Sequence, residues 1–216
     1  MFSEVNGLAI RKLNGKDLLL LLLYVPGHRG QFMEPIRGRT RLTKMVFLFE
    51  KEIYKPFRFD QIIPEEALPK FIPYHFGPFS ADLYTDLHFL IKIGLIISTD
   101  IDGSEPVDPG SAFEYKKWKF IEGIDDGIDE DEYNSPELET YTEQEFQLSD
   151  KGKLFVEEKL LPQLSKNQLD ILQRFKMNWT AGSLQTILEY VYKTYDSMTE
   201  KSLIKEKILG YGDNGV

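Results

Sequence analysis

The stretch SADLYTDLHFLIKIGLIIS, residues 80–98, decides the fold, because it predicts a helix that leads directly into a strand. Ser80 is a favoured N-cap residue, and Asp82 lies in the first turn, where the helix dipole stabilises a negative charge. Apolar residues recur with the spacing of one buried helix face at Leu83, Leu87 and Leu90. Gly94 is a typical helix terminator, and residues 95–98 then form a short β-prone run.

Two further helices are predicted upstream. The first covers residues 15–24, with Asn14 as its N-cap and Pro26 beyond its end. The second begins with Thr40 as its N-cap and ends before Pro56. Its apolar residues again define one buried face, with the spacing i, i+3, i+4, i+7 and i+11: Leu42, Met45, Val46, Phe49 and Ile53.

Strands are predicted on both sides of the third helix. Residues 71–76 indicate short extended structure, and residues 77–78, Gly-Pro, indicate a turn after it. Downstream, residues 115–121 and 140–148 are β-prone and flank an acidic stretch. We expect these two runs to form a β-hairpin with a long, charged tip near residues 122–145.

The C-terminal part predicts helices throughout. Ser149 is an N-cap for a helix that Pro162 limits, and Ser165 with Gln168 forms a capping-box pattern. Two more helices are expected near residues 183–195 and 199–209.

The order of elements predicts an α+β fold that is mostly α. Three helices followed by a β-hairpin wing indicate a winged-helix-like core with a C-terminal helical extension. We expect a winged-helix-like domain over residues 1–148, which includes the acidic tip near 122–145. The helical extension would cover residues 149–210 and pack on this domain, and residues 211–216 would form a frayed tail.

Composition is that of a globular protein, with 216 residues, 42% hydrophobic and 28% charged. The formal net charge is −9, but residues 122–145 hold eleven acidic and no basic side chains, so the remainder of the chain carries +2. The longest apolar run, residues 18–25, is too short to span a membrane. Together with the lack of cysteine and of a signal-peptide pattern, this predicts a cytoplasmic protein without membrane contact.

The sequence offers no recognisable catalytic apparatus. Without cysteine there is no thiolate nucleophile, and the spacing of His28, His75 and His88 does not match a zinc-binding helix. Nucleophile-elbow and phosphate-loop motifs are missing from the sequence. We therefore expect a protein that is not an enzyme and that needs no cofactor or metal.

Two groups of residues are candidates for contact with a partner, either protein or nucleic acid. The first is a basic cluster at the start of the second helix: Arg37, Arg39, Arg41 and Lys44. It could hold phosphates or an acidic protein surface, or simply flank a buried helix as solvated charges. The second is an aromatic group around the Gly77-Pro78 turn: Tyr74, His75, Phe76, Phe79 and Tyr84. Most of these would belong to the core, and an exposed subset could anchor a partner.

Three segments taken together resemble a known prokaryotic family. They are GRTRLTKMVFL at residues 38–48, YHFGPFS at residues 74–80 and GLI at residues 94–96, with Leu83 and Leu87 between the last two. This pattern is similar to that of the SocA-like antitoxin domain, also called Panacea, and of the related YwgA-like proteins. Thr43 stands where those proteins usually have glutamine. The resemblance covers residues 14–97 and brings no catalytic residue with it.

The resemblance implies a protein that neutralises a toxin, or acts as an adaptor, through protein–protein contacts. The partner would then be another protein, such as a toxin. The alternative is a DNA-binding transcription regulator that uses the basic patch at residues 37–44 and forms a homodimer through its C-terminal helices. Against DNA, the third helix offers Asp82 and Asp86 and no Arg, Asn or Gln to contact a base edge.

Overall fold

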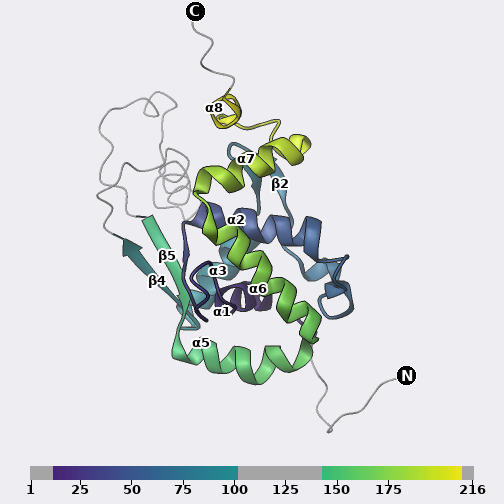
Figure 1. Cartoon of the computed structure of the whole chain (residues 1–216), viewed down its shortest axis with the longest axis vertical. Helices are drawn as coiled ribbons and strands as arrows, with labels where there is room; N and C mark the ends of the chain where they lie inside the picture. Colours follow the sequence, from purple (N-terminus) through teal and green to yellow (C-terminus); the bar gives the residue numbers. More distant parts are fainter. Residues whose placement is uncertain (1–11, 102–142, 211–216) are drawn as a thin grey trace, which may run out of the picture.

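The computed structural model describes residues 12–101 and 143–210. These residues form a mixed α+β fold that is mostly helical, with two small antiparallel sheets (Figure 1). Long helices surround α1, the three-stranded sheet lies on one side, and α7 and α8 lie at the opposite end from α5.

Helix α1 (Gly15–Tyr24) has the predicted boundaries. Asn14 Oδ1 accepts hydrogen bonds from the backbone N–H groups of Lys16 and Asp17 at 2.9 and 3.2 Å. The Asp17 carboxylate accepts the N–H of Asn14 at 2.9 Å and completes a capping box. The six leucines at residues 18–23 are all buried. A helix that is apolar on every side lies inside a protein, and α1 is covered on every side by the rest of the fold.

Helix α2 (Arg39–Leu48) continues as a π-helical turn, Phe49–Ile53. The prediction of Thr40 as N-cap is wrong, because Gly38 occupies that position and Thr40 lies within the helix. Gly38 has a φ of 82°, a conformation that glycine adopts without strain. All residues at 42–49 are buried, so α2 is enclosed on every side rather than on one face.

A tight hairpin connects α2 to α3 (Ala81–Lys92), after short 3₁₀ turns at Phe59–Gln61 and Glu65–Ala67. Strand β2 (Ile72–Tyr74) pairs with β3 (Gly77–Phe79). The predicted turn at residues 77–78 is therefore wrong, because both residues belong to β3 and the chain reverses at residues 75–76. The predicted caps of α3 are confirmed, since Ser80 Oγ accepts the N–H of Leu83 and Gly94 has a φ of 74°.

The three-stranded sheet has the order β1-β5-β4. Strand β4 (Ile96–Ile101) pairs along its whole length with β5 (Glu143–Leu148), and β1 (Ile36–Arg37) pairs with the other edge of β5. The neighbours of β5 among the described residues are therefore β4 and β1. The expected partner strand at residues 115–121 and residues 122–142 of the expected acidic tip lie outside the described residues.

The C-terminal half is helical, as predicted, with these bounds: α5 (Asp150–Phe155), a π turn (Val156–Leu160), a 3₁₀ turn (Leu161–Gln163), α6 (Lys166–Ala181), α7 (Leu184–Thr194), a 3₁₀ turn (Asp196–Met198) and α8 (Lys205–Leu209). The predicted caps Ser149 and Ser165 are confirmed. The last helix is shorter than expected. Before it, the N–H of Leu203 binds the carbonyl of His75 and holds this segment as turns against the hairpin.

One hydrophobic core spans the boundary expected between residues 148 and 149. Leu172 and Phe175 of α6 and Leu188 of α7 are buried in the same cluster as the leucines of α1. The ring of Phe49 lies edge-on to that of Phe175, with centroids 6.4 Å apart. The C-terminal helices thus complete the core around α1 and α2. Among the described residues, no helix is long and apolar enough to cross a membrane.

Candidate protein-binding surface

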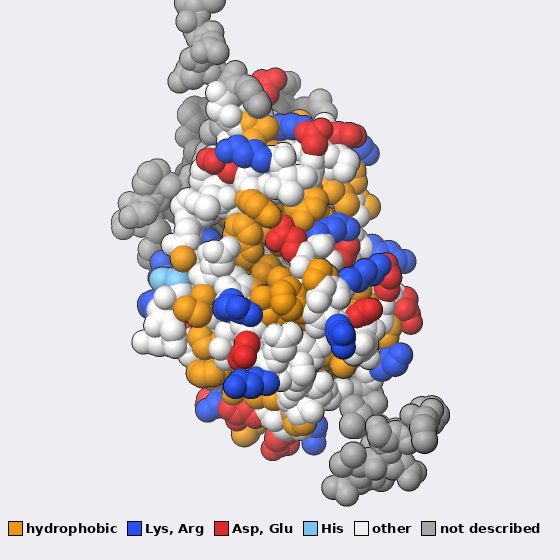
Figure 2. All heavy atoms as spheres, turned by 45° about the vertical axis from the view of Figure 1, so that its right-hand side comes forward, with side chains coloured by type: hydrophobic (Ala, Val, Ile, Leu, Met, Phe, Trp, Pro, Cys, Tyr) orange, Lys and Arg blue, Asp and Glu red, His pale blue; other side chains and the backbone are white. Residues whose placement is uncertain are grey.

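Helices α6 and α7 meet at residues 182–183 and diverge, and the space between them forms an open groove of about 670 Å³. We call it the α6–α7 groove. Its lining residues are Ile171, Arg174, Phe175, Asn178 and Trp179 of α6, Thr186, Glu189, Tyr190 and Lys193 of α7, and Glu52 and Ile53 of the π turn. Figure 2 shows hydrophobic side chains gathered at the middle of the face that lies over these helices, with charged side chains around them.

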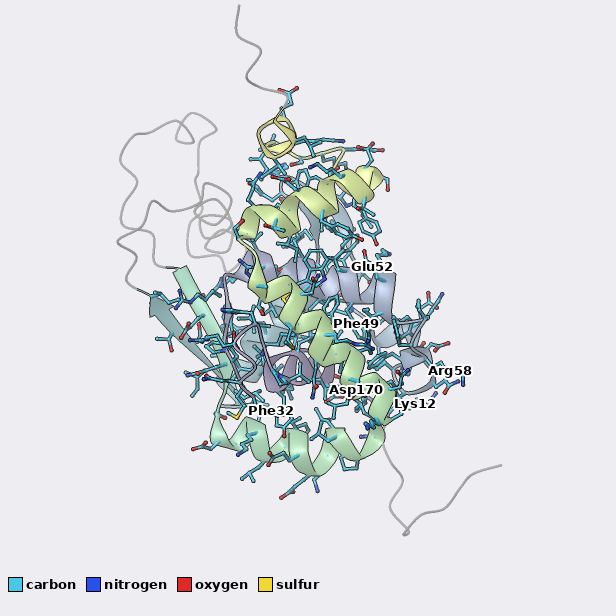
Figure 3. The ribbon with its side chains drawn as sticks, viewed as in Figure 1. Lys12, Phe32, Phe49, Glu52, Arg58 and Asp170 are labelled. Carbon is cyan, nitrogen blue, oxygen red and sulfur yellow. The ribbon has the colours of Figure 1, made fainter. Side chains whose placement is uncertain are left out.

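Two layers of contacts hold the walls of the α6–α7 groove in place. The rings of Trp179 and Tyr190 lie 5.0 Å apart and join α6 to α7. Behind them, Glu52 Oε1 accepts the hydroxyls of Tyr190 and Tyr195 at 2.8 and 2.9 Å. Figure 3 places Glu52 between the ribbons of α6 and α7. The groove is therefore preformed by an aromatic pair and a shared carboxylate.

The contacts with Glu52 also raise the pKa of both tyrosines. The hydrogen bond to Glu52 is the main cause that raises the pKa of Tyr190, and burial adds to it. Burial is the first cause that raises the pKa of Tyr195, followed by the hydrogen bond to Glu52. Both hydroxyls therefore donate to Glu52, and together they tie the π turn to α7 and to the residue that follows it.

The rim of the α6–α7 groove carries charges that differ in how they are paired. Lys193 forms an i,i+4 ion pair with Glu189 at 3.1 Å. Arg174 is exposed, and within residues 12–101 and 143–210 it forms no ion pair or side-chain hydrogen bond. The exposed Asn178, one helical turn further along α6, likewise makes no side-chain hydrogen bond to the described residues. An apolar floor beside an unpaired cation suits an apolar partner segment that also carries a carboxylate.

The predicted basic cluster is mostly occupied by contacts inside the protein. Lys44 is 1% exposed, and its Nζ donates to the carbonyl of Pro78 at 3.0 Å. Arg41 Nη1 donates to the carbonyls of Trp179 and Gly182 at 2.7 and 3.0 Å. These two cations therefore link α2 to the small hairpin and to the end of α6.

The other two members of the cluster differ in exposure. Arg39 is half-buried in the first turn of α2. The Arg37 side chain is 64% exposed and lies 3.4 Å from a carboxylate oxygen of Glu145. Among the four, Arg37 is the residue placed to meet a partner.

The predicted aromatic group lies mainly in the interior. Phe76, Phe79 and Tyr84 are buried. Tyr74 and His75 are half-buried and stack on each other with ring centroids 4.4 Å apart. The group stabilises the small hairpin and offers at most Tyr74 and His75 for contact with a partner.

A second, smaller pocket of about 240 Å³ lies beside the basic cluster and includes His28, Arg29, Arg37 and Arg41. The buried carboxylate of Glu34 lies in it, 2.8 Å from His28 Nδ1 and hydrogen-bonded to the N–H of Arg29 at 3.0 Å. The side chain of Arg29 also faces this carboxylate, with Nε 3.6 Å from Oε1, so Glu34 already has its partners within the protein. Among the described residues, no group of three or more His, Asp or Glu side chains could hold a metal ion.

Sequence reasoning did not find the α6–α7 groove. Ile171, Phe175 and Trp179 are spaced i, i+4 and i+8, which is the ordinary pattern of a helix face packed on a core. Their concave arrangement depends on the angle at which α7 leaves α6, and the sequence gives no direct signal for this angle. Aromatic residues recur between residues 175 and 195, but residues 71–89 are at least as rich in them, so this pattern did not single out the groove.

No known family model, curated protein or solved structure matches this chain.

Proposed function

We propose that the protein is a non-enzymatic protein-binding module of the antitoxin or adaptor type, and that its partner docks in the α6–α7 groove. The observation that carries the proposal is the groove itself, an open and preformed surface with an apolar, aromatic floor. Sites for small molecules typically enclose about 70–90% of the ligand surface. A groove that is open along one side instead suits a segment of a protein, and buried aromatic anchors dominate such interfaces.

The proposed core is winged-helix-like. The described residues include, in chain order, α1, β1, α2, the β2–β3 hairpin, α3, β4 and β5, and β5 lies between β1 and β4 in the sheet. Three helices with a short strand after the first, followed by two antiparallel strands, are typical of winged-helix proteins. In this proposal α3 occupies the recognition position, and β4 with β5 begins the wing.

The exposed face of α3 supports a protein partner over DNA. Phe89 and Ile93 are 45% and 37% exposed on this face, one helical turn apart. The exposed Asp82 adds a negative charge, which is unfavourable next to phosphates. This face of α3 is apolar and acidic. In the basic cluster Arg39 and Arg41 are half-buried and Lys44 is buried. DNA is therefore the weaker alternative.

A titration of labelled duplex DNA, followed by fluorescence anisotropy between about 50 and 200 mM salt, separates the two alternatives. We expect no binding at the low-salt end. Salt-sensitive binding that Arg37→Glu abolishes would instead favour the regulator.

A quantitative affinity capture tests the proposed function directly. Tagged wild-type protein is compared with Asn178→Arg, which fills the α6–α7 groove from an exposed position and removes no described side-chain contact. Met177→Arg is the matched control, since Met177 is the neighbouring residue, is 41% exposed and does not line the groove. We expect a protein from the source organism to be captured equally by wild type and Met177→Arg, and about tenfold less by Asn178→Arg. If every captured protein binds Asn178→Arg as well as wild type, the proposal is wrong.

A further inference from the structure

The partner segment can be specified further if the proposed function holds. We infer that the α6–α7 groove binds an amphipathic α-helix of another protein, with its apolar face on the groove floor and an acidic side chain opposite Arg174. The inference rests on three properties of the described residues: the helical walls, the apolar floor and the unpaired charge at the rim.

The walls of the groove favour a helical occupant over an extended one. Both are stripes of helical residues, from Ile171 to Trp179 on α6 and from Thr186 to Lys193 on α7. The backbone groups along these stripes are used within their own helices. An extended peptide would therefore bring N–H and C=O groups into an apolar groove that offers them no backbone partner. A helix satisfies its own backbone groups and presents only side chains.

The dimensions of the groove match a short helix. The α6 stripe covers nine residues, about 12 Å at 1.5 Å per residue, and the α7 stripe is about 10 Å long. Each corresponds to roughly two helical turns, in which positions i, i+3, i+4 and i+7 of a partner helix face the same side. A volume of about 670 Å³ accommodates several such apolar side chains.

The positive charge of Arg174 at the rim indicates which residue the partner helix carries beside its apolar face. Lys193 and Glu189 neutralise each other, and the charge of Glu52 is shared by two tyrosine hydroxyls. Arg174 is the cation of the rim that forms no ion pair within 4 Å with the described residues. A guanidinium group favours a carboxylate, which it can bind with two parallel hydrogen bonds. An Asp or Glu next to the apolar stripe of the partner helix provides this group.

A selection from a displayed library of random 15-residue peptides tests the inference. Peptides are selected on the immobilised wild-type chain and depleted on Asn178→Arg. We expect enriched sequences with apolar residues at i, i+3, i+4 and i+7 and a neighbouring Asp or Glu. Enrichment of alternating, strand-like sequences would overturn the inference, and so would a library that yields no peptide specific for wild type.

A charge exchange on the best synthetic peptide then tests the role of Arg174. Arg174→Glu should weaken binding about tenfold, equivalent to about 1.4 kcal/mol. Replacing the acidic residue of the peptide by Lys should restore binding to Arg174→Glu. The matched control is Lys166→Glu, an exposed position of α6 outside the groove, which should change affinity less than twofold. Equal affinity for wild type and Arg174→Glu would contradict the predicted acidic flank.

The outcomes separate this inference from the proposed function. A natural partner that is lost with Asn178→Arg, combined with strand-like selected peptides, would preserve the function and overturn the helix. The remaining possible occupant is a second copy of this chain, and analytical ultracentrifugation of the free protein tests for it. A homodimer that Asn178→Arg dissociates would assign the groove to a second copy and overturn the inference.

Discussion

At the scale of single residues, Lys176 is a cation enclosed in the core. It is 0% exposed, and its Nζ donates to the carbonyls of Leu23 at 3.1 Å and Glu34 at 2.6 Å. Burial lowers its pKa to about 7, although the charge of Glu34 acts in the opposite direction. Lys176 thereby ties α6 to the end of α1 and to the loop that follows, in a position where its charge is costly.

This lowered pKa predicts how stability depends on pH. The unfolded chain keeps a lysine with an ordinary pKa of 10.5, so between about pH 7 and pH 10 it binds more protons than the folded chain. The contribution of Lys176 to the free energy of unfolding therefore rises with pH above about 7, by at most about 1.4 kcal/mol per pH unit, and is constant below it. Lys176→Met should remove this slope in urea unfolding between pH 6 and pH 9, whereas the exposed Lys166→Met should keep it. Equal slopes for wild type and Lys176→Met would contradict the burial of the ammonium group.

Arg41 and Arg37 belong to the same basic cluster but have different roles in the structure. Arg41 binds two carbonyls at the end of α6, so Arg41→Ala should lower the free energy of unfolding by about 1.5–3 kcal/mol. Arg37 forms one exposed ion pair, so Arg37→Ala should cost less than about 0.5 kcal/mol. Chemical denaturation of the two variants measures both values. A similar small loss for both would mean that Arg41 does not hold α2 to α6.

At the scale of elements, the junction between β4 and α5 depends on Gly152. A Cβ atom at this position would overlap the carbonyl oxygen of Leu95. Ser149 reinforces the junction, because its Oγ donates to the carbonyl of Gly94 at 2.7 Å and caps α5. The start of α5 is thus held directly against the end of α3.

Gly152→Ala distinguishes this tertiary contact from local helix preference. Helix propensity alone would stabilise the variant by about 1 kcal/mol. We expect instead a loss of about 1–3 kcal/mol in thermal or urea unfolding, because the added methyl group forces β4 and α5 apart. Lys153→Ala, an exposed position of the same helix, should be nearly neutral. A higher free energy of unfolding for Gly152→Ala would contradict this, because it would show that β4 and α5 can move apart at little cost.

Helix boundaries could be predicted from the sequence where a polar cap lies next to a periodic apolar pattern. Asn14, Ser80 and Ser165 begin the helices that they were expected to begin, because capping depends on residues three positions away. The start of α2 was misplaced because the positive φ of Gly38 is not visible in the sequence. Strand pairing was harder to predict, since β1 has two residues and meets β5 across more than 100 positions of the chain.

At the scale of the whole molecule, the fold class was predictable but the proposed binding surface was not. Alternating helices and strands indicated a mostly helical α+β fold, which the structure confirms. The residues chosen as contacts were conspicuous in the sequence because they are charged or aromatic. Two of them, Lys44 and Phe76, are buried, because the fold uses these side chains to join its elements. The α6–α7 groove arises from the angle between two helices, which only the assembled core determines.

Photo-crosslinking from inside the groove tests the central claim most directly. A photoreactive amino acid replaces Asn178, which is exposed in the α6–α7 groove, and in a control replaces Leu154, which is 56% exposed on α5 outside the groove. After irradiation in cells of the source organism, the protein is purified and its crosslinked products are identified. We predict one discrete protein adduct from position 178 that is missing from position 154. The absence of an adduct from position 178, or the same adduct from both positions, would contradict binding in the groove.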